Sequence, residues 1–113
     1  MTANRLTDAQ RELPFLGMPF WFSQGFGLGV SMIVDPEKHA IMSAGSKGAF
    51  SWPGAFGTAW QADPAEDLIT IYLIQDSMPL GPEAVANLAS RRGLGARMAL
   101  PVFQKSVYAA LGK

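Results

Sequence analysis

The chain has 113 residues and a mass of 12.1 kDa, which allows one small domain that buries roughly 65% of its unfolded surface. Nine Lys plus Arg balance nine Asp plus Glu, so no positive field is present to attract nucleic acid or an anionic membrane. The absence of Cys excludes disulfide bonds, thiolate nucleophiles and Cys-ligated metal sites. A hydrophobic share of 49% with 16% charged residues predicts a folded core and some surface that another element covers.

The N-terminal residues carry no targeting or membrane-spanning pattern. The stretch MTANRLTDAQRE has neither a basic leader followed by an apolar run nor a small-residue cleavage site, so no secretion signal is expected and the compartment stays open. The apolar residues 13–22 are interrupted by two prolines and a glycine, and they fall short of the roughly 20 residues that span a bilayer. We therefore expect no membrane segment.

Apolar periodicity and turn signals predict an alternation of strands and turns followed by helices. In chain order, the expected elements are a helical turn over 8–13, a strand over 25–34, a hairpin turn at 35–38 with a return strand near 39–44, a strand over 56–62, a turn at 63–67, a strand over 68–75, and helices over 82–92 and from Pro101 to Leu111. The fold class is therefore α+β, with an antiparallel sheet of about four strands and the C-terminal helices packed on one face.

Two of these segments carry further information about packing. Gly25, Gly27 and Gly29 alternate along one strand, which predicts the close approach of a neighbouring backbone or an aromatic ring. The segment 68–75 is apolar on both faces, which predicts a strand buried on both sides. Since the two C-terminal helices can cover only one face of the sheet, a further covering element is expected.

No pattern of metal-ligating or triad residues is present. His39 is the only histidine, which excludes a multi-histidine metal site, and its place after a turn predicts a solvated edge residue. Asp35 and Asp63, like Glu66 and Asp67, lie in turn sequences where local backbone bonding is the ordinary role. We expect no metal and no cofactor, and no serine lies in a Gly-x-Ser-x-Gly elbow.

The aromatic residues allow two interpretations. They could line an apolar pocket, or they could pack in the core of the sheet, which is the ordinary role of aromatic side chains there. The residues concerned are Trp21, Trp52, Trp60, Phe20, Phe22, Phe26, Phe50 and Phe56.

One stretch carries a family resemblance. Residues 51–60 read SWPGAFGTAW and are followed by the acidic turn DPAEDL, while GFGLGV at residues 25–30 precedes them. Together these segments resemble the C-terminal part of the serine β-lactamase-like family, which includes class C β-lactamases, DD-peptidases, other penicillin-binding proteins and related esterases. The order of elements agrees over residues 6–111: a glycine-rich strand, a hairpin, the motif strand, an acidic turn, a buried strand and a terminal helix.

The resemblance implies roles for four residues. Members of the family carry Lys-Thr-Gly, His-x-Gly or Trp-x-Gly on the strand beside the nucleophile, and Trp52-Pro53-Gly54 fits the last form. Gly54 would let the substrate approach, the backbone N–H of Ala55 would be a donor of the oxyanion hole, and Trp52 and Phe56 would bind the acyl group. Trp52 replaces a cation, which implies an ester or amide substrate and not a β-lactam carboxylate. Read without the family, Pro53-Gly54 is simply a turn before a strand.

The family's catalytic pair is missing from this chain. No Ser is followed three residues later by Lys, and no Tyr is followed two residues later by Asn. The chain is therefore interpreted as one partial domain, residues 1–113 with residues 1–24 leading into it, which is the C-terminal segment of a serine hydrolase. An N-terminal segment upstream, or a separate chain, would supply the nucleophile. The alternative is a non-catalytic module that binds a small apolar ligand or associates with itself.

Overall fold

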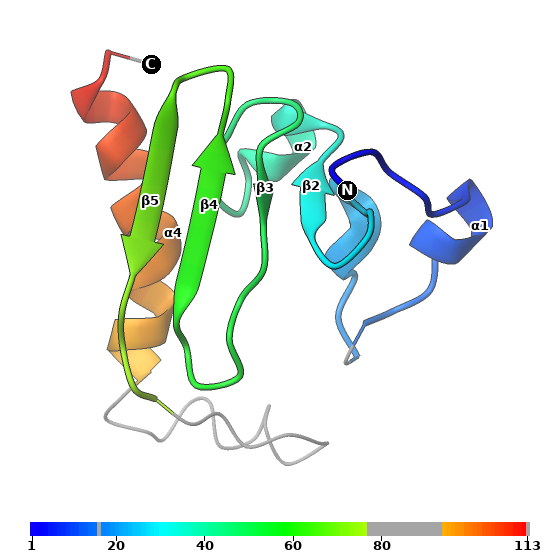
Figure 1. Ribbon diagram of the computed structural model, residues 1–113. Coiled ribbons are helices and arrows are strands. Elements are labelled where there is room, and N and C mark those ends of the chain that lie inside the picture. Colours follow the sequence, from blue (N-terminus) through cyan, green and yellow to red (C-terminus); the bar gives the residue numbers. More distant parts are fainter. Residues whose placement is uncertain (16, 77–93, 113) are drawn as a thin grey trace.

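The computed structural model describes residues 1–15, 17–76 and 94–112. Five strands form one antiparallel sheet in the order β1-β2-β3-β4-β5, and a long helix lies behind the last two strands (Figure 1). The elements are α1 (Asp8–Arg11), η1 (Phe20–Phe22), β1 (Gln24–Phe26), β2 (Ser31–Ile33), α2 (Pro36–His39), β3 (Phe50–Ser51), β4 (Ala59–Asp63), β5 (Leu68–Tyr72) and α4 (Leu94–Ala110). The predicted α+β class is confirmed, with five strands where about four were expected.

Helix α1 forms where the capping box predicted it. The Thr7 hydroxyl accepts a hydrogen bond from the backbone N–H of Gln10, and the Gln10 side chain accepts one from the N–H of Thr7. Two backbone donors at the helix start are thereby satisfied. The helix ends at Arg11, before Pro14, as the sequence indicated.

The single strand expected over residues 25–34 is wrong, because the segment folds into a hairpin of β1 and β2. The N–H of Gly27 donates to the carbonyl oxygen of Val30 at 2.9 Å, and Gly29 has φ of +93°. Glycine adopts that backbone conformation without strain. Because Phe26 pairs with Ser31, the two-residue turn reverses which positions share a face, and Phe26 and Met32 lie on opposite faces of the sheet. The apolar alternation of the sequence runs through the turn without a break, so it did not reveal the turn.

The hairpin turn expected at residues 35–38 is also wrong. The Asp35 side chain accepts from the N–H of Lys38 at 3.0 Å and caps the short helix α2, in which Pro36 holds the first position. This hydrogen bond from the Lys38 backbone, acting against a smaller effect of desolvation, lowers the pKa of Asp35. No strand forms over residues 39–44. The chain instead returns to the sheet at β3.

The register of β4 and β5 divides their side chains between a covered and an open face. On the covered face, Gln61 pairs with Thr70, and both are buried under α4. On the open face, Trp60 pairs with Ile71, and both are exposed. The prediction of a strand buried on both sides is therefore wrong for β5 within the described part of the chain.

Helix α4 is fastened to the sheet by a buried polar cluster. The Tyr108 hydroxyl donates to the Asp63 carboxylate at 2.5 Å and accepts from the Gln61 side-chain amide at 3.1 Å. The N–H of Ser46 also donates to Asp63, at 2.8 Å. Burial opposes ionisation of Asp63, but the hydrogen bonds outweigh it and lower its pKa; burial, together with Asp63, raises the pKa of Tyr108 above its usual range.

The expected helical boundaries differ at the C-terminus. Pro101 was expected to open the last helix, but it lies inside α4, which begins at Leu94. Phe103 of this helix contacts the ring of Tyr72, with centroids 5.4 Å apart. The helix expected over 82–92 falls outside the described residues.

Gly25 and Gly27 have the role that their alternation predicted, whereas Gly29 has open space around it and serves the turn. The N-terminal segment, residues 1–6, runs along the outer edge of β1, where the N–H of Arg5 donates to the carbonyl of Phe26 at 2.8 Å. A Cβ atom on Gly27 would lie 1.8 Å from the carbonyl oxygen of Met1, and one on Gly25 would lie 2.3 Å from Asn4. The close neighbour is therefore the N-terminal backbone and the Asn4 side chain.

Candidate functional site

The Trp-Pro-Gly motif lies in the connection between β3 and β4, and not within a strand as the sequence suggested. Strand β3 ends at Ser51 and β4 begins at Ala59. Between them, the N–H of Gly54 donates to the carbonyl of Thr58 at 2.7 Å, and the N–H of Gly57 donates to Gly54 at 3.2 Å. These bonds fold residues 52–58, here called the motif loop, into a tight turn.

Gly54 is required by the motif loop itself. A Cβ atom at this position would lie 2.1 Å from the hydroxyl oxygen of Thr58 and 3.3 Å from its carbonyl oxygen. Sequence reasoning assigned the missing side chain to substrate approach, and no signal in the sequence pointed to Thr58. A substitution at Gly54 therefore strains the loop before any ligand is considered.

Ala55 and Phe56 form the exposed tip of the motif loop. Phe56 is 54% exposed, and its carbonyl oxygen accepts a hydrogen bond from the N–H of Asp76 at 2.8 Å. This bond attaches the tip to the segment that follows β5. The expected oxyanion-hole residue and one expected substrate-binding residue thus lie on accessible surface, at a position fixed from two sides.

Trp52 belongs to an aromatic cluster that joins the motif loop to the N-terminal third of the chain. Its ring centroid lies 5.3 Å from that of Phe26, 5.9 Å from Phe15 and 6.2 Å from Phe20, all edge-on. Trp21 contacts Phe15, Phe20 and Phe26. All five rings are half-buried, so they present apolar surface beside the motif loop while packing on one another.

The other aromatic candidates are distributed differently. Trp60 and Phe50 form a separate pair, with centroids 6.0 Å apart, across β4 and β3. Phe15 was not singled out by the sequence, because it lies between Pro14 and Gly17 and outside any periodic segment. The rings pack on one another, as the core interpretation expected, although they are only half-buried; a pocket lined by them stays a prediction.

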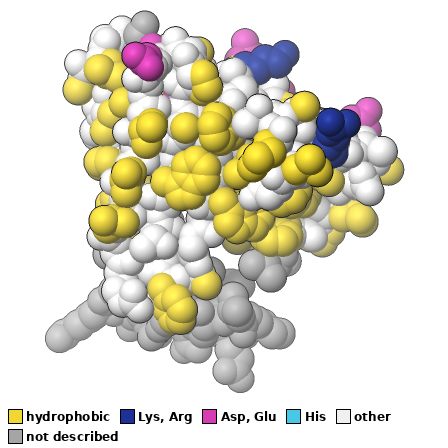
Figure 2. All heavy atoms as spheres, in the orientation of Figure 1, with side chains coloured by type: hydrophobic (Ala, Val, Ile, Leu, Met, Phe, Trp, Pro, Cys, Tyr) yellow, Lys and Arg dark blue, Asp and Glu magenta, His cyan; other side chains and the backbone are white. Residues whose placement is uncertain are grey.

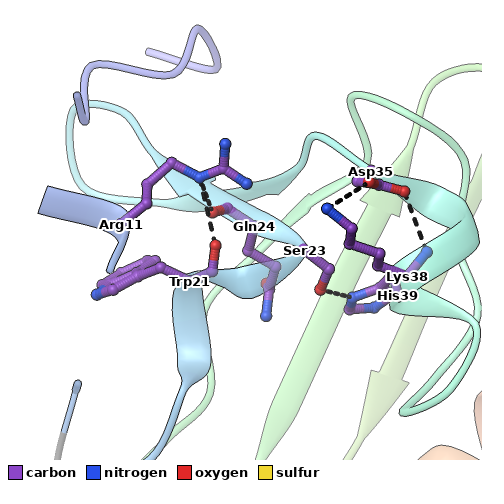
Figure 3. Close-up of polar contacts among 7 residues, drawn as sticks. All are labelled: Arg11, Trp21, Ser23, Gln24, Asp35, Lys38 and His39. Atoms are coloured by element: carbon purple, nitrogen blue, oxygen red, sulfur yellow. Dashed lines mark hydrogen bonds and ion pairs between the residues drawn. The ribbon is translucent and has the colours of Figure 1, made fainter. Parts of the chain in front are cut away.

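His39 is buried, which corrects the expectation of a solvated edge residue. Its Nδ1 atom lies 3.1 Å from the hydroxyl oxygen of Ser23, and burial lowers the pKa of the imidazole (Figure 3). This serine–histidine pair has the composition of a nucleophile and a base, but Ser23 is fully buried. Because no substrate can reach its hydroxyl, the pair is structural and joins α2 to the segment before β1.

Arg11 hydrogen-bonds to the backbone of the segment that carries part of the aromatic cluster. Its Nε atom donates to the carbonyl oxygens of Trp21 at 3.3 Å and Gln24 at 3.1 Å (Figure 3). A charged donor strengthens such bonds to backbone carbonyls. Arg11 of helix α1 thereby holds η1 and β1, whose aromatic rings contact Trp52, in place.

Other described serines also have structural hydrogen-bond partners. The Ser31 hydroxyl donates to the carbonyl of Ser51 at 2.9 Å, and the Ser43 hydroxyl donates to the side chain of Gln104. Across residues 1–15, 17–76 and 94–112, no three His, Asp or Glu side chains gather as metal ligands, and no helix could cross a membrane. The hydroxyl groups of Ser23, Ser31 and Ser43 therefore serve structural hydrogen bonds.

A shallow pocket of about 290 Å³ lies between α2 and α4, lined by Pro36, Ala40, residues 43–45, Lys105 and Tyr108. It contains none of the residues that the sequence singled out for substrate binding. Its walls are largely apolar, as a site for a small apolar ligand would require, but it is open and lies at the low end of ligand-pocket volumes.

The open face of the sheet exposes a group of large apolar side chains. Ile69, Ile71 and Leu73 are 68%, 60% and 78% exposed, and Trp60 lies beside them on β4. Figure 2 views this face and shows hydrophobic side chains spread over β4 and β5 and toward the N-terminal hairpin, with charged side chains confined to the rim. Apolar surface of this extent marks an interaction site in soluble proteins.

Comparisons with known proteins place the chain within longer relatives. No family model and no solved structure matches it significantly. The uncharacterized protein MT1414 of Mycobacterium tuberculosis strain CDC 1551 / Oshkosh and the protein Rv1367c of M. tuberculosis strain ATCC 25618 / H37Rv each match 99% of this chain, at 48% identity over 114 residues. The chain spans 28% of the length of these relatives.

Proposed function

We propose that this chain is the C-terminal segment of a β-lactamase-related serine hydrolase that transfers acyl groups from ester or amide substrates. It would supply the Trp-x-Gly motif and one amide of the oxyanion hole. The nucleophilic serine and its lysine base would come from the part of the protein upstream of this segment. The proposal concerns the completed protein, because the chain lacks both Ser-x-x-Lys and Tyr-x-Asn.

The observation that carries the proposal is the position of the motif loop. Gly54 and Ala55 lie at the turn between two neighbouring strands, and Trp52 leads from them into the aromatic cluster. An oxyanion hole needs a backbone N–H held in a fixed orientation beside the reacting carbonyl, and a doubly fastened loop provides a fixed backbone. The half-buried rings would hold the apolar acyl part of the substrate.

The mechanism assigns each part of the loop one task. As the serine attacks the carbonyl carbon, negative charge develops on the carbonyl oxygen, and the Ala55 N–H would donate to it. Removal of one such donor from a hydrolase slows turnover by roughly 100-fold to 1,000-fold. Trp52 carries no charge, so it favours an uncharged acyl group over one that bears a carboxylate.

The open face supports the proposal from a second side. A serine hydrolase of this class needs a second layer that carries the nucleophile next to the motif, and the exposed residues of β4 and β5 offer an apolar surface for it. The relatives are long enough to contain such a layer, since about 72% of their length has no counterpart in this chain.

A fluorophosphonate probe, which labels activated serines, tests the proposal. We expect labelling of the full-length M. tuberculosis relative, and of a version in which this chain replaces the matched region, but not of the 113-residue chain alone. Labelling of the isolated chain, or an unlabelled full-length protein that is folded, would refute the proposal.

Gly54 gives a sharper test within the full-length protein. Gly54→Ala would stop turnover whether the glycine serves the substrate or only the loop, because its Cβ meets Thr58. The double variant Gly54→Ala/Thr58→Ala removes the clash with the Thr58 hydroxyl and leaves only the 3.3 Å contact with the Thr58 carbonyl oxygen, so most of the loop stability should return. If Gly54 serves substrate approach, turnover stays low in the double variant, whereas recovered turnover would limit Gly54 to a structural role.

A further inference from the structure

The pocket between α2 and α4 lies on the covered face of the sheet. Its position follows from Gln61, which is buried on that face and whose side-chain amide donates to the carbonyl oxygen of Ala44 at 3.0 Å and to the Tyr108 hydroxyl at 3.1 Å. Ala44 and Tyr108 both line the pocket, whereas no residue of the motif loop does. A ligand bound here would therefore be separate from the proposed acyl-transfer site.

Hydrogen bonds between neighbouring elements hold the pocket walls in place. The Ser43 hydroxyl, on the side of α2, donates to the side chain of Gln104 on α4. On the side of the sheet, the Tyr108 hydroxyl donates to the carboxylate of Asp63 at 2.5 Å. Since Gln104 and Tyr108 are both buried, these walls are fixed before a ligand arrives, and binding does not have to order them.

The side chains that form the interior of the pocket leave little for a polar ligand to bind. Pro36, Ala40 and Ala44 are apolar, and the hydroxyl groups of Ser43 and Tyr108 already have the partners named above. An apolar group can therefore enter without breaking a hydrogen bond. Its carbon atoms gain free energy when they leave water for such walls.

Lys105 adds a positive charge to these apolar walls. Its exposed side chain lines the pocket from α4. Within the described residues, the ion pair that the structure shows joins Lys38 to Asp35, and Lys105 has no carboxylate partner. An ammonium group beside apolar walls suits a ligand that carries an anionic oxygen at one end and a hydrocarbon chain at the other.

The volume of the pocket limits the length of that chain. At roughly 30 Å³ for one water molecule in the liquid, about 290 Å³ admits about ten non-hydrogen atoms, a limit that hexanoate respects. We propose that the pocket binds a short-chain carboxylate, with its chain against Ala40 and Ala44 and its carboxylate on the Lys105 ammonium group. This proposal does not depend on the proposed acyl transfer.

An NMR titration of the 113-residue chain with hexanoate tests the proposal. We expect saturable shifts of the amide signals of residues 43–45 and Lys105, with a Kd on the order of 1 mM, and no saturable shift in the motif loop. Acetate, which lacks the chain, should bind at least tenfold more weakly. Hexanol, which lacks the charge, should bind about fivefold more weakly than hexanoate.

Two results of the titration would overturn the proposal. The first is the absence of saturable binding in the folded chain, or in the full-length M. tuberculosis relative that carries this chain in place of the matched region, because the pocket would then be closed or filled by another part of the protein. The second is equal affinity for hexanol and hexanoate, because the ligand would then be a neutral apolar molecule. Fluorophosphonate labelling of the same full-length protein reports separately on the proposed function.

Three variants locate the site. Ala40→Leu places a larger side chain in the pocket at an exposed position of the chain, and it should raise the Kd for hexanoate at least tenfold. Lys105→Met should raise that Kd about fivefold and leave the Kd for hexanol unchanged. Lys47→Met is the matched control, since Lys47 is exposed but does not line the pocket, and it should change neither value.

The variants also contradict the proposal in a defined way. Unchanged binding by folded Ala40→Leu would place the ligand elsewhere. Equal losses in Lys105→Met and Lys47→Met would mean that the net charge of the chain, and not a contact with Lys105, attracts the carboxylate. Because Lys105 is exposed, its variant keeps the test open even where Ala40→Leu does not fold.

Discussion

The two edge strands of this sheet, β1 and β5, differ in composition and in what covers them. The N-terminal segment, residues 1–6, runs along β1, and Gly25 and Gly27 allow this segment to come within contact distance. At β5 the described chain offers only a helix on one face. An edge that is covered by another segment therefore has glycines in its sequence, as near β1. The edge that no described segment covers has an uninterrupted run of β-branched and apolar residues, as in β5.

The largest effect should come from breaking the covered face. Asp63→Ala would leave the Tyr108 hydroxyl and the N–H groups of Ser46 and Ala65 without their acceptor, and should lower the free energy of unfolding by about 3 kcal/mol. Urea denaturation measures this change. Asp63→Asn keeps the shape of the side chain and one acceptor oxygen, so it should lower the free energy of unfolding by less. An equal loss in both variants would mean that the retained oxygen does not help to hold α4.

Breaking the closed edge should have the next largest effect. Gly27→Ala would place a methyl group against the carbonyl oxygen of Met1, which must displace the N-terminal segment, and should cost about 2 kcal/mol. Hydrogen exchange should then show faster exchange at the β1 amides. Gly48→Ala is the matched control, since it has free space but a φ of +88°; it should cost about 1 kcal/mol and leave β1 protected.

A change of pH sharpens the comparison near β1, where His39 packs against Ser23. Burial lowers the pKa of His39, so the unfolded chain takes up a proton below its ordinary value of 6.5 while the folded chain resists it. The contribution of neutral, buried His39 to the free energy of unfolding should therefore be fully present above pH 6.5, and the free energy of unfolding should fall as the pH drops from about 7 to 5. His39→Asn should flatten this slope in urea titrations; an unchanged slope would assign it to another group.

The smallest effect on stability belongs to the open face. Ile71→Lys adds a charge to a residue that is 60% exposed, and the free energy of unfolding of the isolated chain should change by less than about 0.5 kcal/mol. Its solubility should rise. A loss above about 1.5 kcal/mol in denaturation experiments would mean that this face is already covered in the isolated chain.

Parts of the fold could be predicted from the sequence because local chemistry decides them. Thr7 with Gln10 predicted α1, and the apolar run over residues 68–75 predicted a strand where β5 lies, each from the residues of one segment. The Gly27–Val30 turn was missed because the apolar alternation of the sequence runs through it without a break, although Phe26 and Met32 lie on opposite faces of the sheet. Asp35-Pro36 begins hairpin turns and helices alike, so only the surrounding structure decides between them.

The candidate site was less predictable than the fold. The motif singled out Trp52, Gly54 and Ala55 as candidates, but the sequence could not show that Gly54 meets Thr58 or that Trp52 packs on rings some 30 residues away. Asp63 was assigned to a local turn. It does accept from Ala65, but its burial against Tyr108 depends on a helix 45 residues later in the chain.

That separation has a consequence for the order of folding. Every described strand pairs with its neighbour in sequence, so the sheet can form from successive antiparallel pairs, a route that favours rapid folding. The longest of these connections, residues 34–49 between β2 and β3, contains α2. The Tyr108–Asp63 bond closes a much longer loop. Docking of α4 should therefore be the last and slowest event, and until it occurs the sheet exposes both of its faces to other chains.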